Sequence, residues 1–328
     1  MVYVDLPSEK PRDASFYLAM EEYVARTQAG GDRLFTWQVA PTVVFGRNQV
    51  VENEVNLDYC VRHDIAVFRR KSGGGCIYAD RGNVMLSLIT DSDNVALTYN
   101  RYTTMVLYVL QRLGIAAVTS GRNDILVDGK KVSGSAFYRL AGRSIVHGTM
   151  LFDTDMAHMT AAITPSTEKL HSKGVTSVRQ RIALLKDYTD IDIDTFKTFV
   201  RDNLCTEHIA LSDDDVREIE RMEREYASDT FRYGKNPRCD TMHRQHIEGV
   251  GEVTVTLQTR AGTIKAMDIT GDFFVTGDID ERIIRPLRGV ATNREALARA
   301  LPDDTETVIG GLNKDALISL ILSDCPVT

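Results

Sequence analysis

One segment of this 328-residue chain has the residue types needed to hold an anion: residues 69–83 read RRKSGGGCIYADRGN. Three successive glycines let the backbone approach a ligand closely, and their N–H groups can line an anion site. Arg70 and its two basic neighbours add positive charge, and Ser72 can donate a hydrogen bond. The segment lacks the P-loop pattern, and both it and the GVG at 249–251 precede strand-like stretches, so neither is a dinucleotide-binding fingerprint. By itself, residues 69–83 are equally consistent with a flexible turn.

A second segment, residues 121–136, reads GRNDILVDGKKVSGSA and places a lysine in a tight hairpin. The Asp-Gly pair at 128–129 predicts a two-residue turn with Asp124 directly opposite Ser133, which puts Asp124, Lys131 and Ser133 on one face. Such a lysine can neutralise charge that develops on a phosphoryl group or a mixed anhydride, while Asp124 orients it or helps to hold Mg²⁺. Alone, the hairpin also fits a surface ion pair. The two segments together favour a site that activates a carboxylate with a nucleotide.

The elements that must position these segments follow from periodicity and turn residues. Helices are predicted over residues 15–26, 101–113, 193–203, 213–225, 294–299 and 314–323. Strands are predicted over residues 34–39, 42–45, 65–69, 83–90, 124–127, 130–138, 144–152, 252–258 and 263–270. The first two strands are expected to pair around residues 40–41. The strands between 124 and 152 are expected to form an antiparallel meander, with Lys130 solvated on the face opposite Lys131.

The bulk composition describes an ordinary globular protein that is long enough for two domains. The net charge of −7 argues against a general nucleic-acid binder, because such proteins carry a basic excess. The cysteines are dispersed without a CxxC pair, which favours a reducing compartment over a zinc or thioredoxin-type site. No secretory h-region and no membrane-spanning run is visible. These features predict a cytoplasmic enzyme that binds neither nucleic acid nor membrane.

Seven histidines are present, and only one of them is a candidate site residue. His147 lies on a predicted strand, where it is either a ligand contact or a histidine of the core. The others show no metal-binding spacing and are expected at the surface: His63, His158, His171, His208, His243 and His246.

Together the two segments resemble those of lipoate–protein ligase A. Further similar stretches are FTWQVAPTVVFGRNQ at 35–49, HGTMLF at 147–152 and KGVTSVRQRI at 173–182. The resemblance implies an α+β fold with a biotin/lipoate protein ligase-like catalytic domain, residues 1–242, built on mixed, mainly antiparallel sheets. It also implies a small α/β C-terminal accessory domain, residues 243–328, like that of the long bacterial ligases. A boundary near residues 231–237 agrees with this division.

The resemblance also implies the chemistry and the residues that carry it. Lipoate and Mg·ATP would give lipoyl-adenylate and pyrophosphate, and a lysine of an acceptor lipoyl domain would then attack the adenylate. Lys131 corresponds to the catalytic lysine, and Asp124 would lie beside the Mg²⁺ that accompanies ATP. The residues expected to bind ATP or lipoate are Arg70, Ser72, Gly73, Gly74, Gly75, Cys76, Ile77, Tyr78, Asn83, Asp124, Ser133, His147, Gly148 and Thr149.

The implied partners are lipoyl domains of the E2 subunits of 2-oxoacid dehydrogenases, the H protein of the glycine-cleavage system, or both. The enzyme itself is expected to be a monomer. Because such acceptors tend to be acidic, a local basic patch that includes Lys173 and Arg179 is expected despite the net charge.

The chain departs from the family pattern at three positions. Ala79 stands where many members have a histidine, which puts the role of that side chain in doubt. Arg139 is displaced from its common place soon after the K-V-S-G lysine motif, and Phe231 replaces a tryptophan expected near the domain boundary.

Two other functions remain open from the sequence. An ATP-independent octanoyl or lipoyl transferase of the same fold would need an essential cysteine. Cys76 lies beside the glycine loop, but the cysteine of such transferases falls near Thr119 and Ser120 of this chain, so a pocket-lining role is favoured for Cys76. A non-catalytic lipoyl-binding protein is the third possibility, and the intact Lys131 argues against it.

Overall fold

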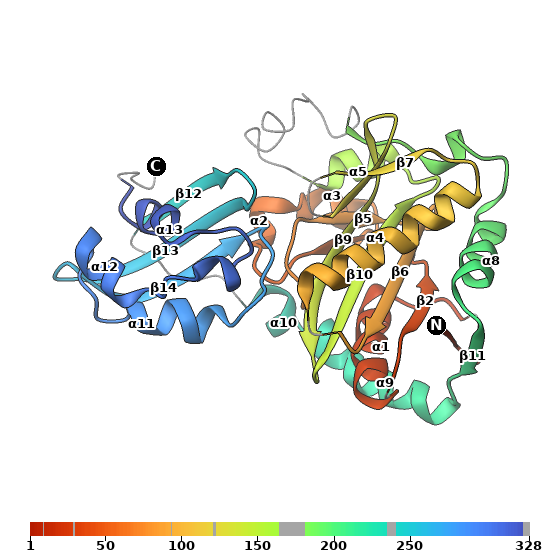
Figure 1. The fold of residues 1–328 in the computed structure, drawn as a ribbon, viewed down its shortest axis with the longest axis horizontal. Helices are drawn as coiled ribbons and strands as arrows, with labels where there is room; N and C mark the ends of the chain where they lie inside the picture. Colours follow the sequence, from red (N-terminus) through yellow and green to blue (C-terminus); the bar gives the residue numbers. More distant parts are fainter. Residues whose placement is uncertain are drawn as a thin grey trace.

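The computed structural model describes residues 1–8, 10–28, 30–92, 94–120, 123–163, 181–234 and 241–323. These residues form a larger N-terminal lobe around an eight-stranded sheet and a smaller C-terminal lobe around a three-stranded sheet (Figure 1). The predicted α+β class, with mixed, mainly antiparallel sheets and a small C-terminal domain, is confirmed. No helix among these residues is both long enough and apolar enough to cross a membrane.

The main sheet has the strand order β11-β1-β2-β6-β10-β9-β8-β7. Its strands are β1 (Val2–Asp5), β2 (Arg33–Trp37), β6 (Asn83–Thr90), β7 (Ala117–Ser120), β8 (Asp124–Val127), β9 (Lys130–Leu140), β10 (Arg143–Leu151) and β11 (Glu207–Ala210). β1 runs parallel to both β11 and β2, and the remaining neighbours are antiparallel. The meander predicted between residues 124 and 152 is therefore confirmed.

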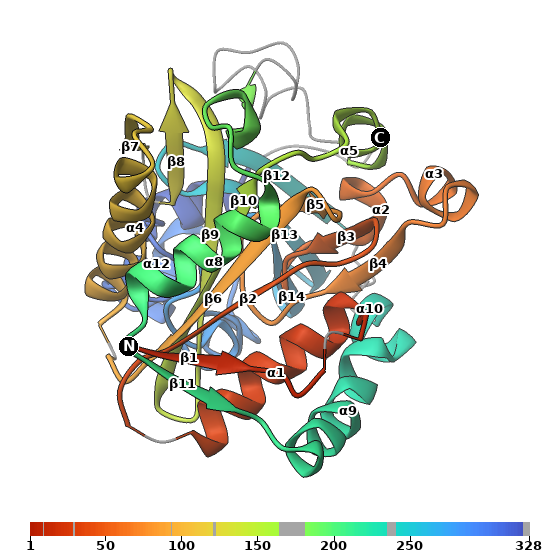
Figure 2. The same ribbon diagram turned by 90° about the vertical axis from the view of Figure 1, so that its right-hand side faces the viewer.

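Helices cover both faces of this sheet. The helices α1 (Ala14–Thr27) and α9 (Asp213–Ala227) lie on one face, and α4 (Val95–Arg112) and α8 (Ile193–Leu204) lie on the other (Figure 2). Successive residues of a strand point to opposite faces, so in β6 Met85 packs towards α1 while Leu86 packs towards α4. This alternation decides which polar side chains of β6 and β10 can meet α1.

A second sheet of the N-terminal lobe corrects one prediction. It consists of β3 (Thr42–Phe45), β4 (Ala66–Arg69) and β5 (Ile77–Ala79) in the order β4-β3-β5. The predicted pairing of the first two strands is wrong, because β2 pairs with β1 and β6 while β3 pairs with β4 and β5. All four residues of β3 are buried, because the strand lies between its two neighbours β4 and β5.

Short helices extend the lobe, and most of them pack against this second sheet. They are α2 (Val51–Glu54), α3 (Leu57–Arg62), α5 (Met156–Ala162), the single turn η1 (Leu185–Asp187) and α10 (Asp229–Tyr233). The turn η1 instead packs through Leu185 into the core beside α8. The helix α4 begins at Val95, earlier than the predicted residue 101, because the Asn94 side chain accepts the Leu97 N–H as an N-cap.

The C-terminal lobe packs helices on one antiparallel sheet. Its elements are β12 (Thr241–Ile247), β13 (Gly251–Arg260), β14 (Thr263–Gly271), η2 (Asp280–Ile284), α11 (Arg285–Leu287), α12 (Arg294–Ala300), η3 (Thr305–Thr307) and α13 (Lys314–Ile321). The sequence analysis missed β12, whose residues TMHRQHI lack an apolar alternation. We propose that the domains divide before Thr241 rather than after residue 242, because the later division would split β12.

Candidate functional site

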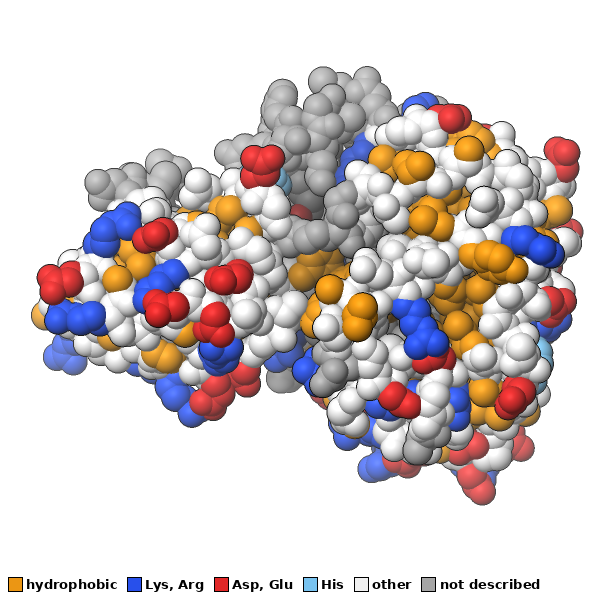
Figure 3. All heavy atoms as spheres, in the orientation of Figure 1, with side chains coloured by type: hydrophobic (Ala, Val, Ile, Leu, Met, Phe, Trp, Pro, Cys, Tyr) orange, Lys and Arg blue, Asp and Glu red, His pale blue; other side chains and the backbone are white. Residues whose placement is uncertain are grey.

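A cavity of about 480 Å³ opens among β9, β10, the glycine loop and the edge of the C-terminal lobe. The surface is hollowed where the two lobes meet, and hydrophobic side chains lie at this hollow (Figure 3). Ligand sites of this size are commonly apolar with a few placed polar groups. The apolar wall includes Leu18, Trp37, Val44, Met85, Leu151 and Met159, and the cationic side chains are Arg70, Lys131 and Arg181.

Lys131 and Asp124 meet across the β8–β9 hairpin as predicted, with Lys131 Nζ 2.6 Å from Asp124 Oδ1. The hairpin carries a bulge that the sequence did not reveal, so Asp124 opposes Gly134 instead of Ser133. A Cβ atom on Gly134 would collide with the end of the Lys131 side chain. The bulge and this glycine therefore make the room in which the lysine reaches the carboxylate.

Arg181 completes this polar cluster, and the sequence analysis assigned it no role. Its Nη2 lies 2.8 Å from Asp124 Oδ2, and the following residue, Ile182, forms a parallel bridge with Lys131. Burial alone would raise the pKa of Asp124, but Lys131 and Arg181 lower it below its usual value. Asp124 is therefore held as a carboxylate between two cations.

The described residues do not offer Mg²⁺ a protein-built site. No group of three or more histidine, cysteine, aspartate or glutamate side chains within them could hold a metal ion. Both oxygens of Asp124 already face cationic side chains, so this carboxylate suits the orientation of Lys131 better than the coordination of a metal.

Arg70 organises the glycine loop from inside. Its Nη2 donates to the carbonyls of Gly73 and Gly75 at 2.8 and 2.7 Å, and its Nη1 donates to Val44 O at 3.0 Å. The guanidinium is buried, and burial lowers the pKa of Arg70 to about 10. Arg70 also lines the cavity, so it can both shape the loop and present positive charge to a ligand.

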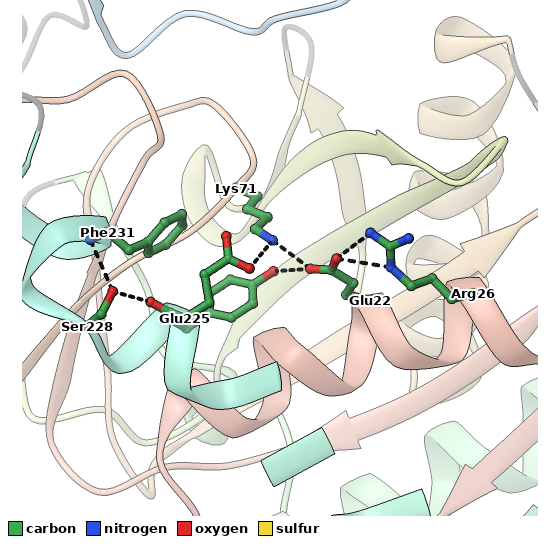
Figure 4. Close-up of polar contacts among 7 residues, drawn as sticks. Glu22, Arg26, Lys71, Glu225, Ser228 and Phe231 are labelled. Carbon is green, nitrogen blue, oxygen red and sulfur yellow. Dashed lines mark hydrogen bonds and ion pairs between the residues drawn. The ribbon is translucent and has the colours of Figure 1, made fainter. Parts of the chain in front are cut away.

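The other two basic residues of the motif turn away from the cavity, contrary to the prediction. Arg69 donates to the backbone carbonyl of Arg232 in α10 at 3.0 Å. Lys71 pairs with Glu22 of α1 at 2.7 Å and with Glu225 of α9 at 3.1 Å (Figure 4). These contacts fix the loop to the helices behind it.

Ser72 and His147 lie next to each other behind the loop. Ser72 Oγ is 2.7 Å from His147 Nε2 and accepts a hydrogen bond from Arg70 Nε at 2.9 Å. Both side chains are buried, and His147 reaches Glu21 through Nδ1 at 2.9 Å. The Ser72 hydroxyl therefore contacts Arg70 and His147, and it is not one of the groups that line the cavity.

Eleven of the predicted site residues meet at one cavity, and four do not. The cavity is lined by Arg70, Gly74, Gly75, Cys76, Ile77, Tyr78, Asp124, Lys131, His147, Gly148 and Thr149. Ser72, Gly73, Asn83 and Ser133 lie outside its lining. Asn83 bonds with Tyr78 O and Thr154, and Ser133 faces away on the buried side opposite Ile125. The predicted role of Asn83 and Ser133 as ligand contacts is therefore not supported by their positions.

The C-terminal lobe also contributes to the site. His246, residues 249–251, Asp272 and Phe274 line the cavity, and Gly74 N–H donates to Phe273 O at 3.0 Å. A Cβ atom on Gly73 would lie 2.5 Å from that same carbonyl oxygen. The surface positions predicted for His246 and His243 are wrong, since His246 lines the cavity and His243 is buried beside Ser323.

Within the described part of the chain, two of the three cysteines are poorly suited to thiol chemistry. Cys60 and Cys205 are buried, and burial raises the pKa of Cys60 and raises that of Cys205 to about 11. Cys76 lines the cavity as predicted, and so does Ser120. Residues 121–122 and most of 173–182, with Lys173 and Arg179 among them, lie outside the described part of the chain.

Comparison with known proteins places this arrangement in one family. Residues 13–205 match the family described as lipoyl protein ligase A/B catalytic domain, and residues 236–321 match the bacterial lipoate protein ligase C-terminus. Lipoate–protein ligase 1 of Staphylococcus aureus is 32% identical over 94% of this chain and 97% of its own length. Lipoate–protein ligase LplJ of Bacillus subtilis is 31% identical over 98% of this chain and 100% of its own.

Two solved structures show the same fold. LipL1 of P. falciparum in complex with lipoate has a TM-score of 0.77 at 19% identity and covers 98% of this chain and 99% of its own. A lipoate–protein ligase A bound with ATP has a TM-score of 0.61 at 22% identity and covers 71% of this chain and 98% of its own. Because the family model covers more than half of the chain and lipoate–protein ligases match it over nearly its full length, the chain belongs to the lipoate–protein ligase family and is a ligase.

Proposed function

We propose that this chain is an ATP-dependent lipoate–protein ligase that forms lipoyl-AMP and then transfers the lipoyl group to a lysine of an acceptor protein. One observation carries the proposal: a single cavity combines an apolar wall with the cationic side chains of Arg70, Lys131 and Arg181. An apolar acyl chain that ends in a carboxylate, placed against a triphosphate, needs both kinds of surface.

The first half-reaction fits the geometry around Lys131. A carboxylate oxygen of lipoate attacks the α-phosphorus of ATP, a P–O bond breaks, and pyrophosphate leaves. Lys131, held by Asp124 at 2.6 Å, stabilises the negative charge that develops on the phosphoryl oxygens and on the departing group. Arg70 holds the glycine loop in a shape that fits beside the phosphates.

The second half-reaction needs no covalent bond to the enzyme. The ε-amine of the acceptor lysine attacks the carbonyl carbon of lipoyl-AMP as the free base, and the C–O bond to AMP breaks with its electron pair leaving on AMP. The amide forms and the surplus proton passes to solvent. Lys131 is placed to neutralise the carbonyl oxygen and the phosphate as the amine adds.

The proposed acceptors are lipoyl domains of 2-oxoacid dehydrogenase E2 subunits and the glycine-cleavage H protein. A neighbour in fold, 25% identical with a TM-score of 0.63, is described as a bi-partite lipoate protein ligase of Thermoplasma acidophilum with its E2 lipoyl domain. We place Mg²⁺ on the phosphates of ATP rather than on Asp124, and no step above depends on a metal held by the protein. We also propose a cytoplasmic location, because the cysteines are dispersed along the sequence without a CxxC pair.

The experiment that tests the proposal is lipoate-dependent exchange of pyrophosphate into ATP. The wild-type chain is expected to exchange only when lipoate is present. Lys131→Ala is expected to lower the exchange rate by about two to three orders of magnitude, the typical cost of removing one such electrostatic stabiliser. Lys130→Ala is the matched control, because Lys130 lies on the same hairpin and is exposed.

The outcomes separate the candidate functions. Exchange that is lost in Lys131→Ala and kept in Lys130→Ala supports the ligase. Absent exchange, together with acyl transfer from an acylated donor protein, would instead establish the transferase. Binding of lipoate with neither reaction would establish a non-catalytic binding protein.

A further inference from the structure

Glu21 of α1 is a charged residue that the proposed chemistry does not use. Its side chain is completely buried beneath β6 and β10, where three side chains reach it. Ser87 Oγ donates to Glu21 Oε1 at 2.6 Å, Tyr138 Oη donates to Oε2 at 3.3 Å, and His147 Nδ1 lies 2.9 Å from both oxygens. A buried carboxylate that collects several donors holds them in place, because each donor would otherwise be left unpaired.

One chain of hydrogen bonds leads from Glu21 to the glycine loop. A carboxylate only accepts hydrogen bonds, so His147 donates from Nδ1, and its Nε2 lies within hydrogen-bond distance of the Ser72 hydroxyl oxygen, at 2.7 Å. Ser72 Oγ in turn accepts from Arg70 Nε at 2.9 Å. Arg70 Nη2 holds the carbonyls of Gly73 and Gly75, so this chain of hydrogen bonds ends at the glycine loop beside the cavity.

A second chain leads from Glu21 to the apolar wall. Ser87 lies directly opposite His147 in the β6–β10 pairing, so both side chains project from the same face of the sheet towards α1. Ser87 Oγ accepts a hydrogen bond from Trp37 Nε1 at 2.9 Å. Trp37 lines the cavity, and this bond fixes the plane of its indole ring.

The directions of these bonds agree with one another. His147 Nδ1 and Ser87 Oγ both donate to Glu21. Arg70 Nε and Trp37 Nε1 donate to the serines of the two chains. The carboxylate thus terminates both chains, and its negative charge also acts favourably on the buried guanidinium of Arg70. Removing the charge while keeping the shape of the side chain would weaken both ends together.

We infer that Glu21 is a positioning residue that supports both halves of the cavity: the glycine loop through His147 and Ser72, and the acyl wall through Ser87 and Trp37. The inference rests on the proposed function, because it assigns the first half to ATP and the second half to lipoate. Ser72 and His147 are then parts of this support rather than groups that bind phosphate.

The inference is tested by measuring the equilibrium binding of ATP and of lipoate separately by calorimetry. Variants that interrupt one or the other chain of hydrogen bonds are compared with the wild type. Ser72→Ala interrupts only the chain of hydrogen bonds that leads to the glycine loop. It is expected to raise the Kd for ATP about five- to tenfold, which corresponds to the loss of one buried hydrogen bond. Ser87→Ala interrupts only the chain of hydrogen bonds that leads to the apolar wall, and it is expected to raise the Kd for lipoate by a similar factor. Glu21→Gln, whose amide nitrogen cannot accept, is expected to raise both.

Tyr138→Phe is the matched control, because its hydroxyl also touches Glu21 but belongs to neither of the two hydrogen-bond chains. It is expected to change either Kd by less than about twofold. A Glu21→Gln variant that melts at a lower temperature yet binds both ligands like the wild type would overturn the inference, as would Ser87→Ala weakening ATP as much as lipoate. If Glu21→Gln does not fold, the two serine variants still decide the question.

A failure of the proposed function has a different appearance. In that case the wild type would show no lipoate-dependent exchange, or would bind neither ligand, before any variant is compared. A wild type that binds and exchanges normally, with unchanged variants, counts against Glu21 alone.

Discussion

The ammonium group of Lys131 lies 2.6 Å from one oxygen of Asp124, across a hairpin whose bulge brings the two side chains to the same face. Arg181 takes the second oxygen at 2.8 Å. Asp124 therefore holds the lysine by one oxygen and is itself held by the arginine. The position of the lysine depends on this carboxylate being ionised.

Asp124→Asn is expected to lower kcat for lipoate-dependent exchange by about tenfold, because an amide binds an ammonium group less strongly than a carboxylate does. The rate and both KM values would be measured by pyrophosphate exchange. Asp128→Asn provides the control: it sits at the turn of the same hairpin with a φ of 50°, which asparagine also adopts. Equal losses in the two variants would show that the hairpin, rather than the ion pair, had been damaged.

The lowered pKa of Asp124 makes a second prediction about stability. A carboxylate whose pKa is lower in the folded chain stabilises the fold at pH values above its unfolded pKa, about 3.9. This contribution is lost as the pH falls through the lowered folded value. The difference in unfolding free energy between wild type and Asp124→Asn is thus expected to be full near pH 6 and to shrink below pH 4. Urea titrations at several pH values measure it, and a difference independent of pH would contradict the assignment.

The anchor of the glycine loop at Lys71 predicts a loss of stability. Glu22 is almost completely buried, and although burial raises its pKa, Lys71 and Arg26 lower it overall. Lys71→Met leaves this carboxylate with fewer donors and is expected to lower the free energy of unfolding by about 1–3 kcal/mol. Glu225→Gln removes the exposed partner of the same lysine and is expected to cost less than about 1 kcal/mol. Urea unfolding of the two variants compares them; the reverse order would show that Glu225 is the main partner.

Trp37 offers a direct reporter of acyl binding. It is the one tryptophan of the chain and it lines the apolar wall of the cavity. Its fluorescence is expected to change in a saturable manner as lipoate is added, because the ligand replaces water or open space beside the indole. The same titration with Trp37→Phe supplies the background, which should stay flat. If the Trp37 fluorescence of the wild type does not change as lipoate is added, the acyl chain binds away from this wall.

Cys76→Ser separates the ligase from a thiol-dependent transferase. Cys76 lines the cavity, while the other described cysteines, Cys60 and Cys205, are buried. The variant is expected to keep lipoate-dependent activity within about threefold, because a serine of similar size occupies the wall equally well. The readout is lipoylation of an acceptor domain with ATP present. Complete loss of transfer would point to an acyl-enzyme formed on this sulfur.

Several elements could be predicted because their cause is local. The Asp-Gly turn at 128–129 specified the hairpin, and the strand predicted over residues 83–90 matches β6 in its bounds. The pairing of Lys131 with Asp124 followed from the same turn. The family motifs at residues 69–83 and 121–136 identified the fold and the chemistry, because each is a short stretch whose residue types and spacing can be recognised in the sequence alone.

Other features were decided by packing. A two-residue turn does not reveal a bulge further along the hairpin, so the opposition of Asp124 and Ser133 was predicted wrongly. Strands β2 and β3 are adjacent in sequence but join different sheets, because the buried residues of β3 need β4 and β5 as neighbours.

The sequence by itself determined which residue types stand at the glycine loop and the hairpin, and therefore the class of reaction. Only the tertiary structure decided which of these residues face the cavity. Of the three basic residues at 69–71, Arg70 alone lines it, while Lys71 pairs with Glu22 of α1. It also brought Glu21 of α1 beneath His147, 126 residues away. The physical reason is that a strand points alternate side chains to opposite faces, and which face becomes a site depends on the helix and the second lobe that pack there.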